Sequence, residues 1–228
     1  MKAALVMPAL NEEGSIGRVV AEAASDLIHE IIVVDNGSSD RTAEVAEAAG
    51  ARVVRQAHKG YGYACSAGAA AAADLVDTLV FMDGDGSDDA GQVALLLEPL
   101  ADDRADLVLG VRRRDLAQPG ALLGHQRLGT LLTAGLIRLL YGVKISDLPP
   151  ARAIRRSVLA DLSMREMTFG WPVEMIVKSA RRGLRIVEVP VVSRPRFAGQ
   201  SKVSGTVRGT LMAAYYLPRT AIRYAWRD

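Results

Sequence analysis

The sequence predicts an α/β domain with a mostly parallel central sheet and helices on both faces. Over the first 110 residues, short apolar runs alternate with longer stretches of helical periodicity, the rhythm of successive βαβ units. The chain has 228 residues, of which 50% are hydrophobic and 24% charged. This length and composition suit one compact domain with its own core.

The first 110 residues contain the clearest elements. Apolar runs predict strands over residues 3–7, 30–34, 52–54, 79–82 and 106–109. Helical patterns lie between them at 15–25, 40–49, 61–73 and 90–100. Ser15 is a suitable N-cap for the first helix, and the polar run 38–40 can cap the second.

After residue 110 the alternation fades. Helices are expected over 122–140, 156–162, 171–182 and 206–226, and strands over 152–154 and 185–189. Residues 143–145 also look strand-like, and residues 193–204 form a polar loop. Pro218 should interrupt the last helix, because proline removes a backbone donor. We divide the domain (1–228) into a first half (1–110), a second half (111–205) and a C-terminal amphipathic helix (206–228).

Composition excludes several classes of protein. A net charge of +2 and a pI of 8.8 are too mild for a nucleic-acid-binding protein. Cys65 is the single cysteine, so the chain cannot form an internal disulfide. We see no signal peptide and no apolar run of ~18 residues, and therefore expect a cytoplasmic protein without membrane spans.

The loop after residue 82 carries the strongest chemical signal. Asp83 and Asp85 flank Gly84 at the end of an apolar strand, and glycine lets the backbone turn so that both carboxylates face one ion. Hard oxygen ligands suit Mg²⁺ or Mn²⁺ shared with substrate phosphates. The alternative is a polar turn in which Ser87 or Asp88 caps the next helix.

Three other loops lie at strand ends or helix starts, where open α/β sheets bind ligands. Residues 8–13 and 35–42 are polar and could contact a ribose or a base, although turn formation explains them equally well. Lys59 lies at the start of a helix with two glycines nearby, as a phosphate-binding residue could, but the segment lacks the nucleotide P-loop pattern.

Taken together, the motifs resemble glycosyltransferase family 2, which has the GT-A nucleotide-sugar-binding fold. They are PALNEE (8–13), VVDNGSSDRT (33–42), HKGYGYA (58–64), MDGDGSDD (82–89), DLPPARAI (147–154), FGWPVEM (169–175) and EVPVVSRPRFAGQSK (188–202). The sequence looks most similar to the branch that includes dolichyl-phosphate mannosyltransferase and bacterial enzymes using polyprenyl phosphates.

The resemblance implies roles for particular residues and an inverting transfer from a UDP- or GDP-sugar. The first half would bind nucleotide and the second half the acceptor. Base and ribose would be lined by Pro8, Ala9, Leu10 and Glu12, with Asp35 on the base, Lys59 near the nucleotide, and Asp83, Gly84 and Asp85 at the metal and diphosphate.

Three positions depart from the family pattern. Asn36 stands where many members have a second Asp, Ser87 where the mannosyltransferase branch often has Gln, and Pro150-Ala151 where Gly-Phe or Pro-Phe is usual. They leave the base preference, the metal shell and the acceptor pocket open.

The identity of the acceptor decides what else the site needs. Transfer to a hydroxyl needs a general base, for which Asp147 is the first candidate and Glu174 the second. Transfer to a polyprenyl phosphate instead needs cations that hold the phosphate. The candidates for that role are Arg112, Arg113, Arg127, Arg196, Ser201 and Lys202, the last three in a loop that could close over the diphosphate.

The last helix is amphipathic, with an arginine stripe beside apolar residues. Val207, Leu211, Tyr215, Ile222 and Trp226 lie near one face. Such a face can rest on an anionic membrane, and it can equally well pack against the rest of the domain or against a second copy in a homodimer. The pair Asp83 and Asp85 and the arginine-rich second half lead us to prefer a polyprenyl-phosphate acceptor, reached peripherally at the inner membrane face. A soluble hydroxyl acceptor and a non-catalytic nucleotide-sugar-binding module are the alternatives.

Overall fold

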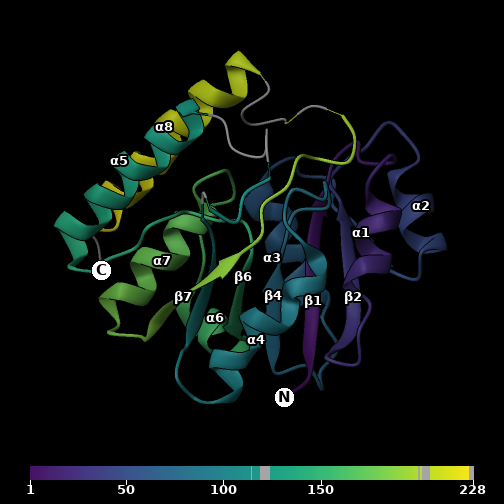
Figure 1. The fold of residues 1–228 in the computed structure, drawn as a ribbon, viewed down its shortest axis with the longest axis horizontal. Helices are drawn as coiled ribbons and strands as arrows, with labels where there is room; N and C mark the ends of the chain where they lie inside the picture. Colours follow the sequence, from purple (N-terminus) through teal and green to yellow (C-terminus); the bar gives the residue numbers. More distant parts are fainter. Residues whose placement is uncertain (114, 119–123, 200, 202–205, 226–228) are drawn as a thin grey trace.

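The predicted architecture is confirmed. The computed structural model describes residues 1–113, 115–118, 124–199, 201 and 206–225, without the side chains of residues 124–128 and 208. In this part of the chain, seven strands form one sheet in the order β3-β2-β1-β4-β6-β5-β7 (Figure 1). They are β1 Ala3–Ala9, β2 Ile28–Asp35, β3 Arg52–Arg55, β4 Thr78–Phe81, β5 Leu107–Arg112, β6 Arg152–Arg155 and β7 Ile186–Val191.

The sheet is parallel except at β6. β1 pairs in parallel with β2 and β4, and β5 pairs in parallel with β7. β6 runs antiparallel to both of its neighbours, β4 and β5. The start of β6 therefore lies at the same edge as the carboxyl ends of the other strands, which is the edge where open α/β sheets place their ligands.

Helices cover both faces of the sheet. They are α1 Ile16–Ala23, α2 Thr42–Ala48, α3 Tyr61–Ala71, α4 Val93–Ala101, α5 Gly124–Tyr141, α6 Arg156–Leu162, α7 Trp171–Arg181 and α8 Val207–Arg223, with a 3-10 turn at Ala90–Gln92 before α4. Along β1, Leu5 and Met7 face a core with α1, α2 and α4, whereas Ala4 and Val6 face a core with α3, α5, α6, α7 and α8. Burial on both faces explains why the strands read as continuous apolar runs.

Two local predictions are wrong. Residues 143–145 form no strand; Ile145 is buried in the core, so its apolar character reflects packing without strand pairing. Pro218 lies inside α8 and does not interrupt it. Ala214, whose carbonyl loses its donor at this proline, is exposed, so water can satisfy that carbonyl.

Helices α5 and α8 lie side by side at one end of the molecule (Figure 1). The Tyr141 hydroxyl at the end of α5 donates a hydrogen bond of 2.5 Å to the carbonyl of Ala221 on α8. None of the described helices combines the length and apolar character needed to cross a bilayer.

Candidate functional site

The acidic loop after β4 packs directly against the loop after β1. A Cβ atom on Gly84 would lie 2.7 Å from the Cδ1 atom of Ile16 and 3.8 Å from the Cβ atom of Ala9. A larger residue at this position would have to displace the end of the Ile16 side chain. Pro8 and Ala9 form the end of β1, so the structure places the predicted nucleotide segment beside the predicted metal segment.

Glu12 is the polar link between these two loops. Its carboxylate is buried and accepts a hydrogen bond of 3.1 Å from the Ser15 hydroxyl, which is also 3.1 Å from the carbonyl of Gly84. The backbone N–H of Glu12 donates to the Thr42 hydroxyl at 2.8 Å. The acid is thus held in place from both sides.

Arg196 joins the two predicted ligand-binding acids. One guanidinium nitrogen donates to Glu12 Oε1 at 2.6 Å, and the other terminal nitrogen donates to Asp85 Oδ2 at 2.5 Å. All three side chains are largely buried, with 17% of Arg196, 8% of Glu12 and 9% of Asp85 exposed. A cation from the second half of the chain therefore sits between two carboxylates of the first half.

The loop that carries Arg196 is fastened to the acidic loop. The backbone N–H of Phe197 donates to the carbonyl of Asp85 at 3.1 Å, and that of Arg194 donates to the carbonyl of Ser87 at 2.9 Å. The Phe197 ring contacts the guanidinium groups of Arg18, 3.9 Å from the ring centroid, and Arg194, at 4.5 Å. Residues 194–197 of this loop are thus packed against the acidic loop, while its closure over a diphosphate stays a prediction.

Asp83 lies in a concentration of negative charge. Desolvation in the wall of the site, together with the charges of Asp85 and Asp88, raises the pKa of Asp83 to about 8. Among the described residues, no three His, Cys, Asp or Glu side chains are grouped so that they could share one metal ion. Two carboxylates nevertheless fit Mg²⁺ or Mn²⁺, because such ions complete their shell with water and substrate phosphates.

Two further residues of the segments predicted to bind nucleotide, Asp35 and Asn36, lie at the end of β2. Asp35 is buried, and its carboxylate accepts the N–H of Ser38 at 2.9 Å. The Asn36 amide donates to the carbonyls of Gln56 and His58, at 3.1 and 2.7 Å, and accepts the N–H of Gly60 at 2.8 Å. An aspartate could not make the two donations, so this departure from the family pattern has a structural reason.

The remaining members of the nucleotide side are more exposed. Lys59 is exposed, and its Cε atom lies 3.6 Å from where a Cβ of Gly37 would be, so it reaches back toward the loop after β2. Leu10 is half-buried at the start of the loop after β1.

The second half contributes an ion pair to the same edge. Arg112, at the end of β5, donates through Nε and Nη2 to both carboxyl oxygens of Asp147, each at 2.9 Å. Arg113 instead pairs with Asp115 on the surface, at 2.7 Å. Ser201 is half-buried beyond the loop, whereas Lys202 and the Arg127 side chain lie outside the described residues.

A family model described as "Glycosyl transferase family 2" matches residues 4–163. The chain belongs to glycosyl transferase family 2. It is 39% identical to an uncharacterized glycosyltransferase of Mycobacterium tuberculosis over 92% of this chain and 93% of that one. It is 36% identical to a dolichyl-phosphate hexose transferase of Haloferax volcanii over 88% of this chain and 86% of the relative.

A solved structure confirms the GT-A fold of the glycosyltransferase. The chain is similar to glucosyl-3-phosphoglycerate synthase from Mycobacterium tuberculosis, solved in complex with Mn²⁺, UDP-glucose and phosphoglyceric acid. The alignment covers 100% of this chain and 80% of the synthase, with a TM-score of 0.78 and 24% sequence identity. At this identity the likeness concerns the fold.

The two candidate bases of the glycosyltransferase are both engaged in other interactions. Although burial opposes it, the hydrogen bonds and charge of Arg112 lower the pKa of Asp147, which weakens this carboxylate as a proton acceptor. Glu174 is fully buried and accepts the backbone N–H groups of Arg165 and Glu166 while pairing with Lys178 at 2.7 Å. Glu174 thus holds the backbone before α7, and its predicted role as a base gains no support.

Two residues of this edge were not among the predicted site residues. Arg194 was passed over, although it lies in the same loop as Arg196 and forms an ion pair with Glu22 on α1. Asp88 was considered only as a helix cap, but Asp89 is the cap, accepting the N–H of Gly91 at 3.1 Å. The four aspartates among residues 83–89 were the sequence feature that could have identified Asp88 as a site residue.

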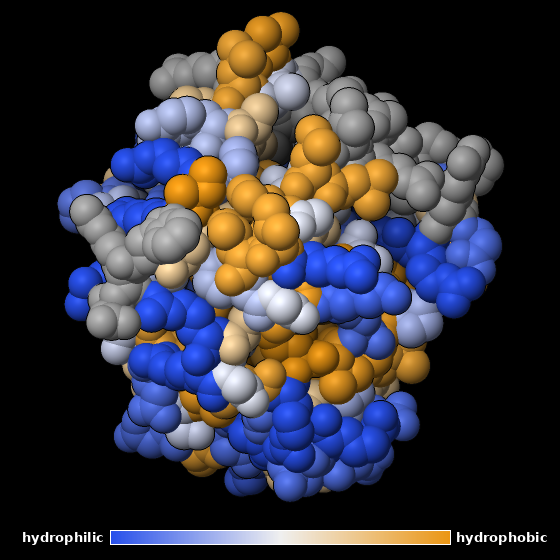
Figure 2. Space-filling view, turned by 90° about the vertical axis from the view of Figure 1, so that its left-hand side faces the viewer, coloured by the Kyte–Doolittle hydropathy of each residue, from blue (hydrophilic) through white to orange (hydrophobic). Residues whose placement is uncertain are grey.

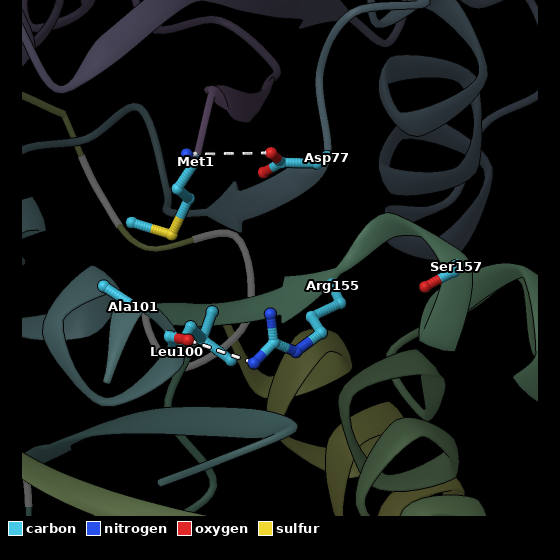
Figure 3. Close-up of a pocket in the computed structure, with 6 residues that line it drawn as sticks. All are labelled: Met1, Asp77, Leu100, Ala101, Arg155 and Ser157. Carbon is cyan, nitrogen blue, oxygen red and sulfur yellow. Dashed lines mark hydrogen bonds and ion pairs between the residues drawn. The ribbon is translucent and has the colours of Figure 1, made fainter. Parts of the chain in front are cut away.

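A hollow of about 370 Å³ lies at the opposite edge of the sheet, between Asp77 before β4 and Arg155 at the end of β6 (Figure 3). Its charged groups already contact each other or nearby backbone. The terminal amine of Met1 lies 3.9 Å from Asp77, and Arg155 donates to the carbonyl of Leu100 at 3.0 Å. This hollow lacks the convergent unpaired groups of a substrate site.

Proposed function

We propose that the enzyme is an inverting, metal-dependent glycosyltransferase that moves a sugar from a UDP- or GDP-sugar to a polyprenyl phosphate. The observation that supports a nucleotide-sugar donor is the contact of Arg196 with both Glu12 and Asp85 near the end of β4. Two loops that bind nucleotide in this family supply the acids, and a buried cation already lies between them.

On the donor side, Asp83 and Asp85 would hold Mg²⁺ or Mn²⁺, which neutralises charge on the leaving diphosphate. Glu12 can accept hydrogen bonds from ribose hydroxyls, and Asp35 from a base N–H. Arg196 needs to leave at least one of its carboxylates when nucleotide and metal arrive. Released from them, its guanidinium can bind the diphosphate bidentately.

On the acceptor side, the support is an apolar surface on α5 and α8. The large apolar side chains that α5 exposes are Leu131, Leu132 and Leu139, and those of α8 are Val207, Leu211, Tyr215 and Ile222. Leu139 is 81% exposed and Val207 80%. Figure 2 views this side of the molecule and shows apolar side chains gathered in its upper half. An apolar surface of this kind suits contact with lipid.

The chain order connects that surface to the site. α5 follows β5 and Arg112, and α8 follows the loop that carries Arg196. A lipid whose chain lies against the two helices would bring its phosphate toward these cations. The relative named for dolichyl phosphate supports the same acceptor class, since it is 36% identical over 88% of the chain.

The donor half is tested by ligand-dependent stability. We expect UDP or GDP with Mg²⁺ or Mn²⁺ to raise the melting temperature, because binding to the folded state stabilises it. Asp85→Ala should abolish the metal-dependent part of the shift, whereas Asp115→Ala, a surface change, should keep it. A full metal-dependent shift in Asp85→Ala would remove the metal role of this acid.

The acceptor half is tested by product extraction. Sugar from a labelled nucleotide sugar should move into the organic phase when polyprenyl phosphate is supplied. A second acceptor class, a soluble hydroxyl compound, is favoured by one observation: the buried carboxyl of Asp88 has no hydrogen-bond partner among the described residues. Label found only in water-soluble product would replace the lipid acceptor with this class.

A further inference from the structure

Asp88 lies in the acidic loop after β4 (residues 82–89), at the point where this loop contacts the second half of the chain. Asp85 follows β4, whereas Asp88 forms an isolated antiparallel bridge with Ser193, just beyond β7. The N–H of Arg194 donates to the carbonyl of Ser87 at 2.9 Å and fixes this contact. The backbone of Asp88 therefore lies beside the loop after β7, which belongs to the half of the chain assigned to the acceptor.

The Asp88 carboxyl is buried without a partner. Only 2% of the residue is exposed, and neither carboxyl oxygen has a hydrogen-bond partner among the described residues. A buried polar group in this state costs stability, so folding alone gives no reason for it. Since Asp89 provides the helix cap, Asp88 has no capping role either.

The charged groups that face Asp88 are committed to other partners. Arg112 holds Asp147 through two hydrogen bonds of 2.9 Å, and Arg152 donates to backbone carbonyls, including that of Pro172 at 3.0 Å. Burial raises the pKa of Asp88 to about 7, with Asp85 and Asp147 adding to the shift and Arg112 and Arg152 opposing it. A carboxyl that titrates near neutral pH is suited to proton transfer.

We propose that Asp88 is the general base of the transfer, accepting the proton of the attacking O–H group. The O–H is either an alcohol or the P–OH of a singly ionised phosphate monoester. As the acceptor oxygen forms its bond to the anomeric carbon, the bond from that carbon to the diphosphate oxygen breaks. The electron pair leaves with the diphosphate, and the acceptor proton passes to the Asp88 carboxylate. This inference rests on the proposed function and deepens its acceptor side.

The test is Asp88→Asn, with Asp89→Asn as the matched control because asparagine caps a helix as well as aspartate does. We expect Asp88→Asn to lower kcat by about 10²–10⁴-fold, with nucleotide and Mn²⁺ affinity by calorimetry unchanged. Asp89→Asn should keep kcat.

The melting temperature of Asp88→Asn provides a second measurement. A purely structural role for Asp88 would lower this temperature, whereas the proposed role predicts that it rises. The raised pKa means that folded Asp88 binds a proton that the unfolded chain releases, so Asp88 destabilises the fold as pH rises from about 4 through 7. Asp88→Asn should therefore melt at a higher temperature than the wild type, and by more at pH 8 than at pH 4. A melting temperature below that of the wild type at pH 8 would overturn the assignment.

The pH dependence of the kcat loss separates the two sources of the O–H. A phosphate monoester loses its second proton near pH 6 and then needs no base, so with polyprenyl phosphate the loss should shrink between pH 6 and pH 8. With an alcohol the loss should persist across this range. Wild-type kcat in Asp88→Asn at both pH values, with either acceptor, overturns the proposal. Failure of the wild type to bind nucleotide overturns the proposed function itself.

Discussion

Arg196 takes the place of a bound cation between two acids that ligands are expected to use. Arg196 donates one N–H to each carboxylate, at 2.6 Å to Glu12 and 2.5 Å to Asp85, and little water reaches either acid. Two such acids would repel each other without a positive charge nearby. The guanidinium thus keeps the site folded in the absence of ligand, and it competes with any metal that approaches Asp85.

Replacing Arg196 by methionine tests this competition. We expect Arg196→Met to lower the free energy of unfolding without metal by about 3–5 kcal/mol, since it removes the cation between two buried carboxylates. Added Mn²⁺ should then raise the melting temperature by more than it does in the wild type. The surface change Arg113→Met is the control and should match the wild type with and without Mn²⁺. Equal Mn²⁺ shifts in wild type and Arg196→Met would show that the arginine and the metal do not compete.

At the scale of elements, the sequence predicted a helix or strand wherever the residues of that element alone determine its hydrophobic pattern or its end. The β1 run was predicted because both of its faces are buried, and α7 because Gly183 marks its end. The antiparallel direction of β6 could not be predicted, since a short apolar run carries no sign of its orientation. The contact between Glu12 and Arg196 could not be predicted either, because it depends on the loop after β7 folding back past β5, β6 and β4 to the end of β1.

Glycines in two helices test how tightly α3 is packed on the sheet. A Cβ on Gly68 of α3 would lie 2.3 Å from Val6 Cγ1 and 2.9 Å from Val34 Cγ2, whereas on Gly135 of α5 it would have no described atom within 4 Å. Gly68→Ala should therefore cost about 1–3 kcal/mol by overpacking. Gly135→Ala should add about 0.5–1 kcal/mol, because alanine is the better helix former. Urea unfolding measures both, and a stabilised Gly68→Ala would contradict the tight packing.

At the scale of the whole molecule, polar and apolar functions lie on different parts of the surface. The charged site occupies the carboxyl edge of the sheet, and, among the described side chains, seven large exposed apolar ones lie on α5 and α8. These two helices lie at one end of the molecule (Figure 1). On α8, Arg219 lies 5.6 Å from the ring centroid of the exposed Tyr215, whereas Arg223 lies 3.9 Å from the buried Glu166. Apolar side chains beside cations match an anionic lipid surface better than a purely apolar partner. The apolar side chains can contact the acyl chains while the cations contact the anionic head groups.

Vesicle binding tests that match directly. We expect the wild type to sediment with vesicles containing anionic phospholipid, and to sediment less at 0.5 M NaCl than at 0.05 M, because salt screens the arginines. Leu132→Glu with Leu211→Glu should abolish binding by placing carboxylates on the surface of α5 and α8. Leu75→Glu provides a matched control, since Leu75 is 48% exposed outside these helices and should bind as the wild type does. If the double variant instead binds vesicles normally but shifts the chain from dimer to monomer in light scattering, the surface joins two copies of the enzyme, and the lipid acceptor loses its structural support.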